Sequence, residues 1–206
     1  VDRDQTIFEV SDKHVGKSWV SAVIRYADNS DGHSNVFSAV RPFHELDARW
    51  SAGLRLWDDE RREALYELGD EAAEYQHERD YYSAFGGWSK GLRDGRARRW
   101  TAGIVYDDNQ FETVIDGSLP AAIPENRKLV YPFVGFELVE DEFETSTNRD
   151  QISRTEDFMM GTHVSATLGW SDKSFGADRD AIVYFARASH GFGSLQKNAL
   201  LLSSSI

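Results

Sequence analysis

The sequence contains no cysteine, which excludes disulfide bonds, thiolate metal sites and a cysteine nucleophile. It also lacks any apolar run near the ~18–20 residues that a membrane-spanning helix requires. Positive charge is scarce, because 23 Lys and Arg stand against 35 Asp and Glu and give a net charge of -12. Since phosphate backbones are bound by clustered cations, this balance argues against a nucleic-acid partner.

Length and composition leave two classes of protein open. A chain of 206 residues fits one domain or a piece of a larger one. An apolar fraction of 40% can supply the core of a soluble domain. It also suits a membrane barrel, in which every second residue of a strand faces lipid. We divide the chain into a lead-in over residues 1–16 and a β-barrel domain, or barrel segment, over residues 17–206.

Alternation with a period of two dominates the chain. In residues 99–106, one set of alternate positions is apolar and the other set is small or polar. The apolar set is Trp100, Ala102, Ile104 and Tyr106, and the opposite set includes Arg99, Thr101 and Gly103. Residues 19–26, 49–57 and 158–170 repeat the pattern. A helix would scatter these sets around a cylinder, whereas a pleated strand places each on one side.

The alternation predicts about nine strands, most of them ~9–12 residues long. They are expected at 19–26, 35–41, 49–57, 81–92, 99–106, 129–144, 158–170, 181–189 and 195–204. Strands of soluble proteins usually have ~5–6 residues, whereas a tilted membrane strand needs ~9–11. The acidic segment Asp58–Asp80 is either a short helix or two strand extensions that meet at Gly69-Asp70, and we favour the extensions.

Aromatic residues near the strand ends point to a membrane. Tyr26, Trp50, Trp100, Tyr106 and Trp170 lie at such positions and resemble an aromatic girdle. The opposite strand faces carry Arg, Ser, Thr, Gly and His, as a polar lumen requires. We therefore predict an all-β fold: an antiparallel up-and-down transmembrane β-barrel of about 8–10 meandering strands, or a segment of a larger barrel. The alternative is a soluble sandwich or lipocalin-like barrel with the Trp residues in its core.

The candidate binding residues face the expected lumen. They are Arg25, Arg55, Arg99 and His163, and the three arginines could form a positive ladder that meets the acidic loops. We expect no catalytic residue, cofactor or metal, and therefore no enzyme.

Two short motifs do not change that expectation. The G-x-S-x-G pattern at 87–91 has catalytic meaning only on a strand–turn–helix elbow, and here it lies within a strand. His44-Glu45 begins a zinc motif, H-E-x-x-H, that Ala48 leaves incomplete.

Three stretches together resemble the barrel of the Omp85 superfamily of bacterial outer-membrane proteins, which includes surface antigens and the BamA- and TamA-like proteins. They are 99–107 (RWTAGIVYD) with Phe111 after it, 131–136 (YPFVGF) and 154–161 (RTEDFMMG). The resemblance covers roughly 100–192. It lacks the V-R-G-F/Y loop tip of the superfamily, since 189–192 reads SHGF.

The resemblance implies a location and a function. It places the chain in the bacterial outer membrane, in contact with lipid or lipopolysaccharide and with other outer-membrane or periplasmic proteins. The implied activity is insertion or translocation of proteins or lipids. A passive porin-like or structural barrel and a soluble ligand-binding barrel are the alternatives. Ser205-Ile206 is not the aromatic end of a complete barrel, so we expect either an internal piece of a ~12–16-strand barrel or a distant branch.

Overall fold

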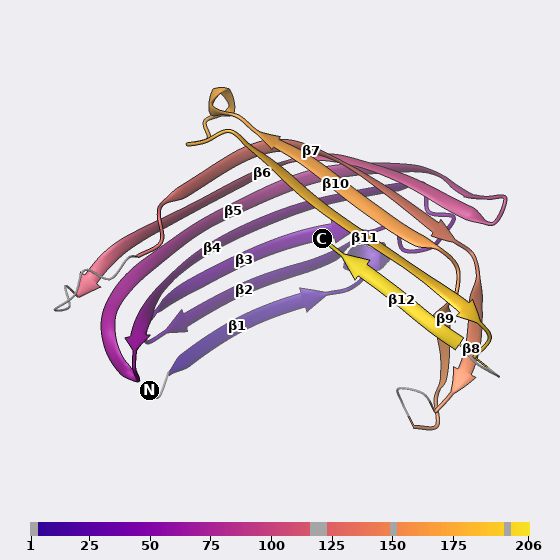
Figure 1. The fold of residues 1–206 in the computed structure, drawn as a ribbon, viewed down its shortest axis with the longest axis horizontal. Coiled ribbons are helices and arrows are strands. Elements are labelled where there is room, and N and C mark those ends of the chain that lie inside the picture. The colour runs from indigo at the N-terminus through magenta and orange to yellow at the C-terminus, as the bar shows by residue number, and fades with distance from the viewer. Residues whose placement is uncertain (1–3, 116–122, 149–151, 196–198) are drawn as a thin grey trace.

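The computed structural model describes residues 4–115, 123–148, 152–195 and 199–206. Ten strands form one antiparallel sheet in the order β1-β2-β3-β4-β5-β6-β7-β10-β11-β12, and β8 and β9 form a separate hairpin (Figure 1). The sheet strands are β1 (Gln5–Asp12), β2 (Ser21–Asn29), β3 (Gly32–Arg41), β4 (Trp50–Glu67), β5 (Asp70–Arg93), β6 (Arg96–Ile115), β7 (Arg127–Glu140), β10 (His163–Ser171), β11 (Ala181–Gly193) and β12 (Ala199–Ser205). The hairpin strands are β8 (Phe143–Thr147) and β9 (Thr155–Met159), and two short 3-10 helices are η1 (Val15–Lys17) and η2 (Lys173–Phe175).

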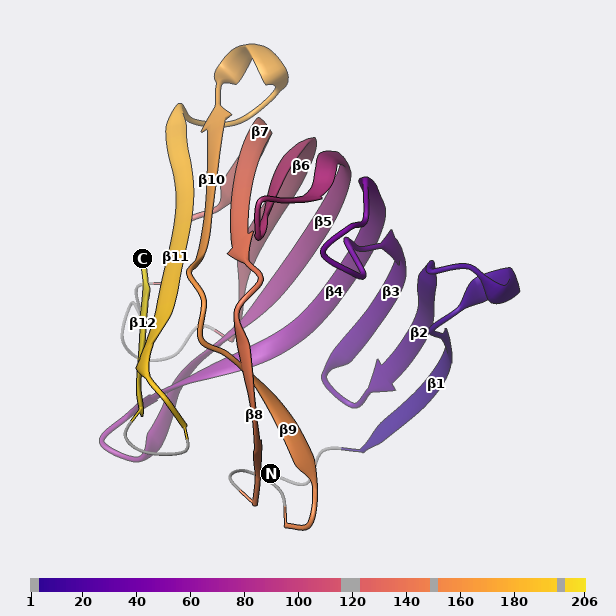
Figure 2. The same ribbon diagram turned by 90° about the vertical axis from the view of Figure 1, so that its right-hand side faces the viewer.

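The sheet is a meander that curves into a wall, with the β8–β9 hairpin projecting from one end (Figure 2). The all-β antiparallel prediction is therefore confirmed. In the described ranges, β1 pairs only with β2 and β12 only with β11, so closure into a barrel is not observed. None of the helices among these residues is long and apolar enough to cross a membrane.

Strands β4, β5 and β6 are the longest, with 18, 24 and 20 residues. The segment Asp58–Asp80 is not helical: β4 continues to Glu67, and β5 begins at Asp70. Leu68 and Gly69, with φ of 54° and 96°, make the two-residue turn between them. Positive φ at both central residues matches the twist of a hairpin. The preference for strand extensions is confirmed.

Three segments differ from the expected strands. The lead-in expected over residues 1–16 contains β1, whose Gln5–Asp12 pairs with Ala22–Asn29 of β2. The strand expected over 129–144 ends at Glu140, and the strand expected over 158–170 is divided into β9 and β10. The carbonyl of Glu142 accepts hydrogen bonds from the N–H groups of Met160 and Gly161, which closes the base of the β8–β9 hairpin. These backbone contacts are long-range, so alternation could not reveal them.

Large apolar side chains are concentrated on an exposed face of the sheet instead of in a central core. Buried apolar residues of the described chain are mostly small or medium-sized, such as Ala27, Ala97, Val105 and Val139. By contrast, the tryptophans at 50, 88, 100 and 170 are each about half exposed. This is the reverse of a soluble sandwich, whose large apolar residues turn inward.

Candidate functional site

The convex, outer face of the sheet carries a continuous belt of apolar side chains from β2 to β11, which we call the outer belt. It comprises Ile24, Tyr26, Trp50, Leu54, Leu56, Tyr82, Trp88, Trp100, Ile104, Tyr106, Val134, Phe136, Leu168, Trp170, Ile182 and Tyr184. Ile104 is 53% exposed and Ile182 is 71% exposed. Soluble monomers rarely expose contiguous apolar patches of this extent. The belt is therefore an unusually extended exposed apolar surface.

Aromatic rows mark both borders of the outer belt. Trp50 pairs with Trp88 and Trp88 with Trp100, and we call this row the tryptophan border. The tyrosine border consists of Tyr82 and Tyr106, which pair across β5 and β6 and whose rings stack with centroids 5.4 Å apart. On β5 and β6 the two borders are six residue steps apart, which is ~20 Å along the strand at ~3.3 Å per residue. This length is of the same order as the ~25 Å apolar band of outer-membrane barrels.

Beyond the tyrosine border, the outer face becomes acidic within two residues. Asp58, Asp80 and Asp108 form a cross-strand row, and Glu60 beside Glu78 forms the next. Like charges directly opposite each other are unfavourable, and water weakens this repulsion more effectively than an apolar medium does. The tyrosine border therefore separates an apolar part of the outer face from an acidic part.

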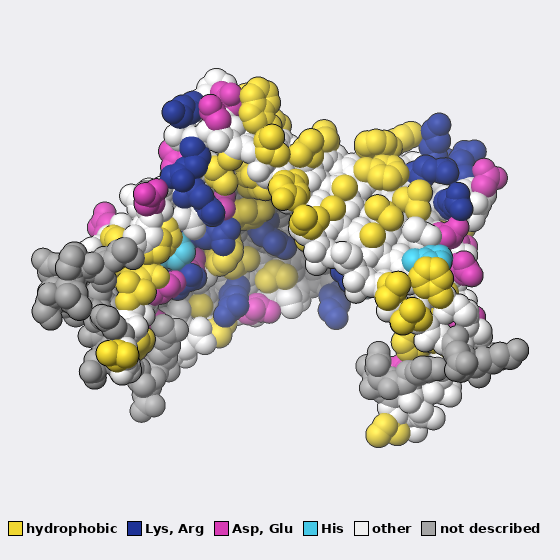
Figure 3. Space-filling model, in the orientation of Figure 1, with side chains coloured by type: hydrophobic (Ala, Val, Ile, Leu, Met, Phe, Trp, Pro, Cys, Tyr) yellow, Lys and Arg dark blue, Asp and Glu magenta, His cyan; other side chains and the backbone are white. Residues whose placement is uncertain are grey.

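The concave face encloses a hollow of about 390 Å³. Apolar and basic side chains both line the hollow between the two ends of the sheet (Figure 3). Its lining comes from strands β3 to β11 and includes Arg55, Tyr81, Ser83, Phe85, Val105, Tyr131, Phe133 and Thr167. Since strands so far apart line one hollow, the face must be strongly curved.

Aromatic rings cover glycines on this concave face. Gly53 pairs with Phe85, and Gly103 pairs with Phe133. A Cβ at Gly53 would lie 2.3 Å from the Phe85 ring, and one at Gly103 would lie 2.3 Å from the backbone carbonyl oxygen of Ala84 and 2.7 Å from the Phe133 ring. Only glycine lets the rings lie flat against the sheet, which makes room for the curvature.

The chain segment 42–49, between β3 and β4, covers the end of the hollow at the tryptophan border. Arg99 donates to the Glu137 carboxylate at 2.9 Å and to the backbone carbonyl of Glu45 at 3.0 Å. The Arg99 guanidinium also lies 5.0 Å from the Phe43 ring centroid. His163 Nε2 lies 2.9 Å from the other Glu137 oxygen. These contacts hold the segment against the concave face.

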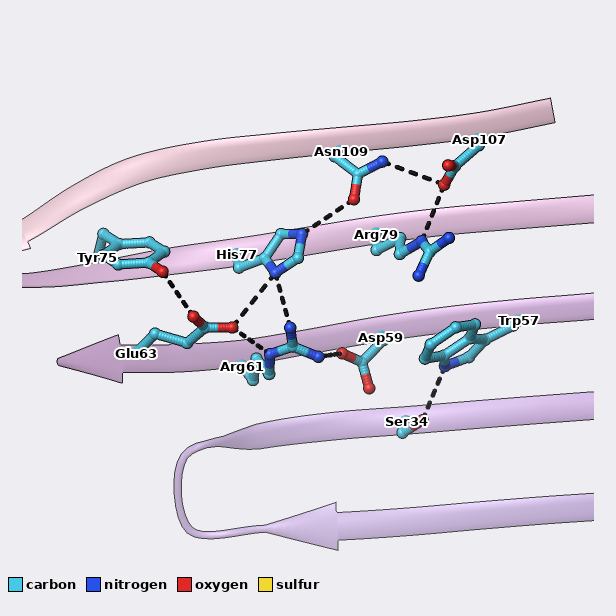
Figure 4. Close-up of polar contacts among 10 residues, drawn as sticks. All are labelled: Ser34, Trp57, Asp59, Arg61, Glu63, Tyr75, His77, Arg79, Asp107 and Asn109. Atoms are coloured by element: carbon cyan, nitrogen blue, oxygen red, sulfur yellow. Dashed lines mark hydrogen bonds and ion pairs between the residues drawn. The ribbon is translucent and has the colours of Figure 1, made fainter. Parts of the chain in front are cut away.

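A second polar cluster lies on the concave face beyond the tyrosine border (Figure 4). Arg61 Nη2 lies 3.1 Å from His77 Nδ1, and His77 Nε2 lies 3.1 Å from Asn109 Oδ1. His77 Nδ1 also lies 3.4 Å from a Glu63 carboxylate oxygen, so this ring nitrogen faces both a guanidinium donor and a carboxylate acceptor. Asn109 donates in turn to Asp107, which also accepts a 2.8 Å hydrogen bond from Arg79.

Glu63 ends the same cluster and accepts hydrogen bonds from Tyr75 and Arg61. Burial raises the pKa of the Glu63 carboxyl, but these two hydrogen bonds outweigh burial, so the pKa lies below its ordinary value. The contact also raises the pKa of the Tyr75 hydroxyl, because ionisation would place two negative charges together. The cluster therefore favours an ionised Glu63 and a neutral Tyr75.

The four candidate lumen residues lie on the concave face but do not act together. Arg25 is half-buried on β2, opposite Val36, and Arg55 is exposed at the hollow. Cross-strand pairing places Ser38 and Ser83 beside Arg55, so the arginines do not form the expected ladder. Only Arg99 and His163 come together.

Glu137 joins Arg99 to His163 and was not singled out from the sequence. It is the one carboxylate among the alternate positions of β7 that face inward, which include Tyr131, Phe133 and Gly135. An isolated charge on such a face is a signal for a cross-strand partner. The identity of that partner depends on the register of β6, β7 and β10, which the sequence alone does not specify.

The G-x-S-x-G pattern at 87–91, whose serine is Ser89, lies within β5 and has a structural role there. Ser89 is 1% exposed, and its hydroxyl accepts a hydrogen bond from the Gly91 N–H at 3.0 Å. The register shifts between Ser89 and Leu92, and Gly91 has a φ of 75°, so the motif forms a β-bulge. Within the described ranges, no group of three or more His, Cys, Asp or Glu residues is arranged to hold a metal ion.

Comparison with known proteins identifies no relative: no family model matches the chain, and no curated protein sequence matches it.

Proposed function

We propose that this chain forms the wall of a bacterial outer-membrane β-barrel, with the outer belt in contact with lipid. The observation that carries the proposal is the outer belt itself: a band of exposed apolar side chains on one face of one sheet, from β2 to β11, bordered by aromatic rows and then by charge. Lipid chains supply the apolar surroundings, and the headgroup region suits the amphipathic rings at both borders.

The two edge strands are part of this proposal. Within lipid, unpaired backbone N–H and C=O groups are costly, so a membrane wall needs a partner for β1 and for β12. The two edges could pair with each other after further curvature, or with additional strands. Both arrangements satisfy the same requirement.

Within this class we propose a role in protein or lipid transfer rather than free conduction. The segment 42–49 lies across one end of the hollow, held by Arg99 and Phe43. An open porin lumen needs a continuous aqueous path, which such a segment obstructs. The sequence resemblance to Omp85 barrels also supports a role in protein or lipid transfer. In planar bilayers we expect little steady conductance, and a porin-like conductance would favour the passive alternative.

Membrane contact is tested with lipid vesicles that contain brominated acyl chains, which quench nearby tryptophans. The protein should float with the vesicles, resist extraction by urea, and lose much of its tryptophan emission. Replacing Trp88 and Trp100 by Phe should remove a large share of the quenching. Trp57→Phe is the matched control, since Trp57 faces inward and donates to Ser34 Oγ at 3.3 Å. A protein that stays in the aqueous fraction with an unquenched belt would contradict the proposal.

A further inference from the structure

The β5–β6 hairpin contains a concavity next to the tryptophan border that gathers positive charge. It has a volume of about 280 Å³ and is lined by Trp88, Lys90, Gly91, Arg93, Arg96, Arg98 and Trp100. All four basic side chains are exposed, and no acidic side chain lines it within the described part of the chain. In a protein with a net charge of -12, four cations around one concavity are an unusual concentration.

The β-bulge in β5 creates this arrangement. Without it, Leu92 would follow Lys90 on the outer face. The extra residue between Ser89 and Leu92 instead brings Arg93 directly opposite Arg96. Cations directly opposite each other repel, so this hairpin end is electrostatically unfavourable unless an anion lies between them.

One of the four cations forms an ion pair within the described chain. Arg96 forms an ion pair with Glu140 at 2.9 Å. In the ranges that the structure describes, Lys90, Arg93 and Arg98 have no ion-pair partner. Asp94, at the turn, is exposed and does not line the concavity. Three cations therefore remain available to an external ligand.

We propose that this concavity binds the phosphate group of an anionic lipid, an inference that rests on the proposed membrane location. Arginine forms paired hydrogen bonds with phosphate oxygens, and Lys90 adds a point charge. Trp88 and Trp100, which are 54% and 53% exposed, flank the site at the height where indoles meet lipid headgroups.

The outer face beside the two indoles leaves room for an acyl chain. Gly86 pairs with Ala102 on the same face as the Trp88–Trp100 pair, two residues nearer the middle of the outer belt. The space that a Cβ would occupy at Gly86 is open, with no atom within 4 Å. A lipid whose phosphate lies among the arginines can therefore extend its chain along the outer belt. A soluble anion would make no contact with that apolar surface, so the geometry favours a lipid.

The test uses the whole chain folded in maltoside micelles and titrated with phosphatidylglycerol or with phosphatidylcholine. The variant is Lys90→Gln, Arg93→Gln and Arg98→Gln together. The matched control, with the same change of charge, is Lys13→Gln, Arg62→Gln and Lys173→Gln, all exposed and away from the concavity. We expect the variant to lose at least about tenfold in affinity for phosphatidylglycerol, and the control to keep it.

Three outcomes would overturn the site. The first is equal affinity of variant and wild type for phosphatidylglycerol. The second is full displacement of the lipid by inorganic phosphate at a matching concentration, which would indicate a plain anion site. The third is loss of affinity in the control as well. If the triple variant does not fold, Arg98→Gln alone should still weaken binding, by about threefold.

The two proposals fail in different ways. A chain that inserts into phosphatidylcholine vesicles but has no preference for phosphatidylglycerol contradicts the lipid site and leaves the barrel wall intact. A chain that enters no vesicle contradicts both.

Discussion

Strands β4, β5 and β6 pass through two regions that differ in the polarity of their outer face. Between the tryptophan and tyrosine borders, the outer face is apolar and half-exposed, as at Trp88 and Ile104. Beyond the tyrosine border, the outer face is acidic, and the aromatic Tyr75 faces inward and is 6% exposed. The outer face of the same continuous strands therefore changes from apolar to acidic at one height, where the concave face carries the polar cluster around His77. Period-two alternation specifies a face, and the surroundings at each height decide which residues that face carries.

The largest effect is expected from placing a charge on the outer face at each of the two heights. Ile104→Arg, within the outer belt, should destabilise the folded protein in lipid vesicles by about 2–4 kcal/mol, because a charge near the bilayer centre is poorly solvated. Gln110→Arg lies on the same strand and face beyond the tyrosine border and should change stability by less than about 0.5 kcal/mol. Urea unfolding in vesicles measures both, and equal effects would remove the distinction between the two regions.

A somewhat smaller effect is expected on the concave face behind the outer belt. Arg99→Met removes the 8%-exposed guanidinium that holds Glu137 and segment 42–49, and should cost about 2 kcal/mol because a partly buried carboxylate loses its cation. Arg55→Met makes the same change at an exposed position on this face and should cost less than about 0.5 kcal/mol. Urea unfolding in micelles measures both changes in the free energy of unfolding. Similar changes for the two variants would contradict a role for the Arg99 contacts.

The concave cluster beyond the tyrosine border offers a pH-dependent comparison. Tyr75→Phe removes a hydrogen bond to the Glu63 carboxylate and should cost about 1 kcal/mol at neutral pH. Because the folded-state pKa of Glu63 is lowered, its contribution is present above the ordinary carboxyl range and is lost as pH falls through the lowered pKa. The difference between wild type and Y75F should therefore shrink in acid. Tyr66→Phe, at an exposed tyrosine, is the control; a pH-independent difference would contradict the assignment.

The smallest effect is expected at the end of β7, outside both regions. A backbone hydrogen bond from Thr162 and the guanidinium of Arg96 lower the pKa of the Glu140 carboxyl to about 2. In Arg96→Gln that pKa should rise, though it should stay below the usual range because the Thr162 N–H remains. Carboxyl carbon chemical shifts followed by NMR between acid and neutral pH measure the change. An identical titration in both proteins would show that the ion pair contributes nothing.

Much of the wall could be predicted from the chain because it depends on local alternation. The antiparallel all-β class and the central strands both follow from patterns shorter than about ten residues. Strand β1 was missed because its residues Ile7 and Phe8 are adjacent and interrupt a clean alternation. The break between β7 and β8 lies in the acidic run Glu140-Asp141-Glu142, which the predicted strand over 129–144 passed through.

The grouping of side chains could not be predicted to the same extent. The register decides that Arg99 meets Glu137 while Arg55 meets serines, and a shift of one residue would move each to the other face. The basic concavity depends on a single extra residue in β5. Gly91 permits this β-bulge, but a glycine in a strand does not by itself predict one.

By itself, the sequence determined that this chain forms long strands with one apolar and one polar face, since side-chain direction in a strand follows from backbone geometry alone. Only the tertiary structure decided that the apolar face is the convex one, that Glu137 links Arg99 to His163, and that four cations converge beside the tryptophan border. Curvature and register are collective properties of ten paired strands. They arise from contacts between residues far apart in the chain, which no local pattern contains.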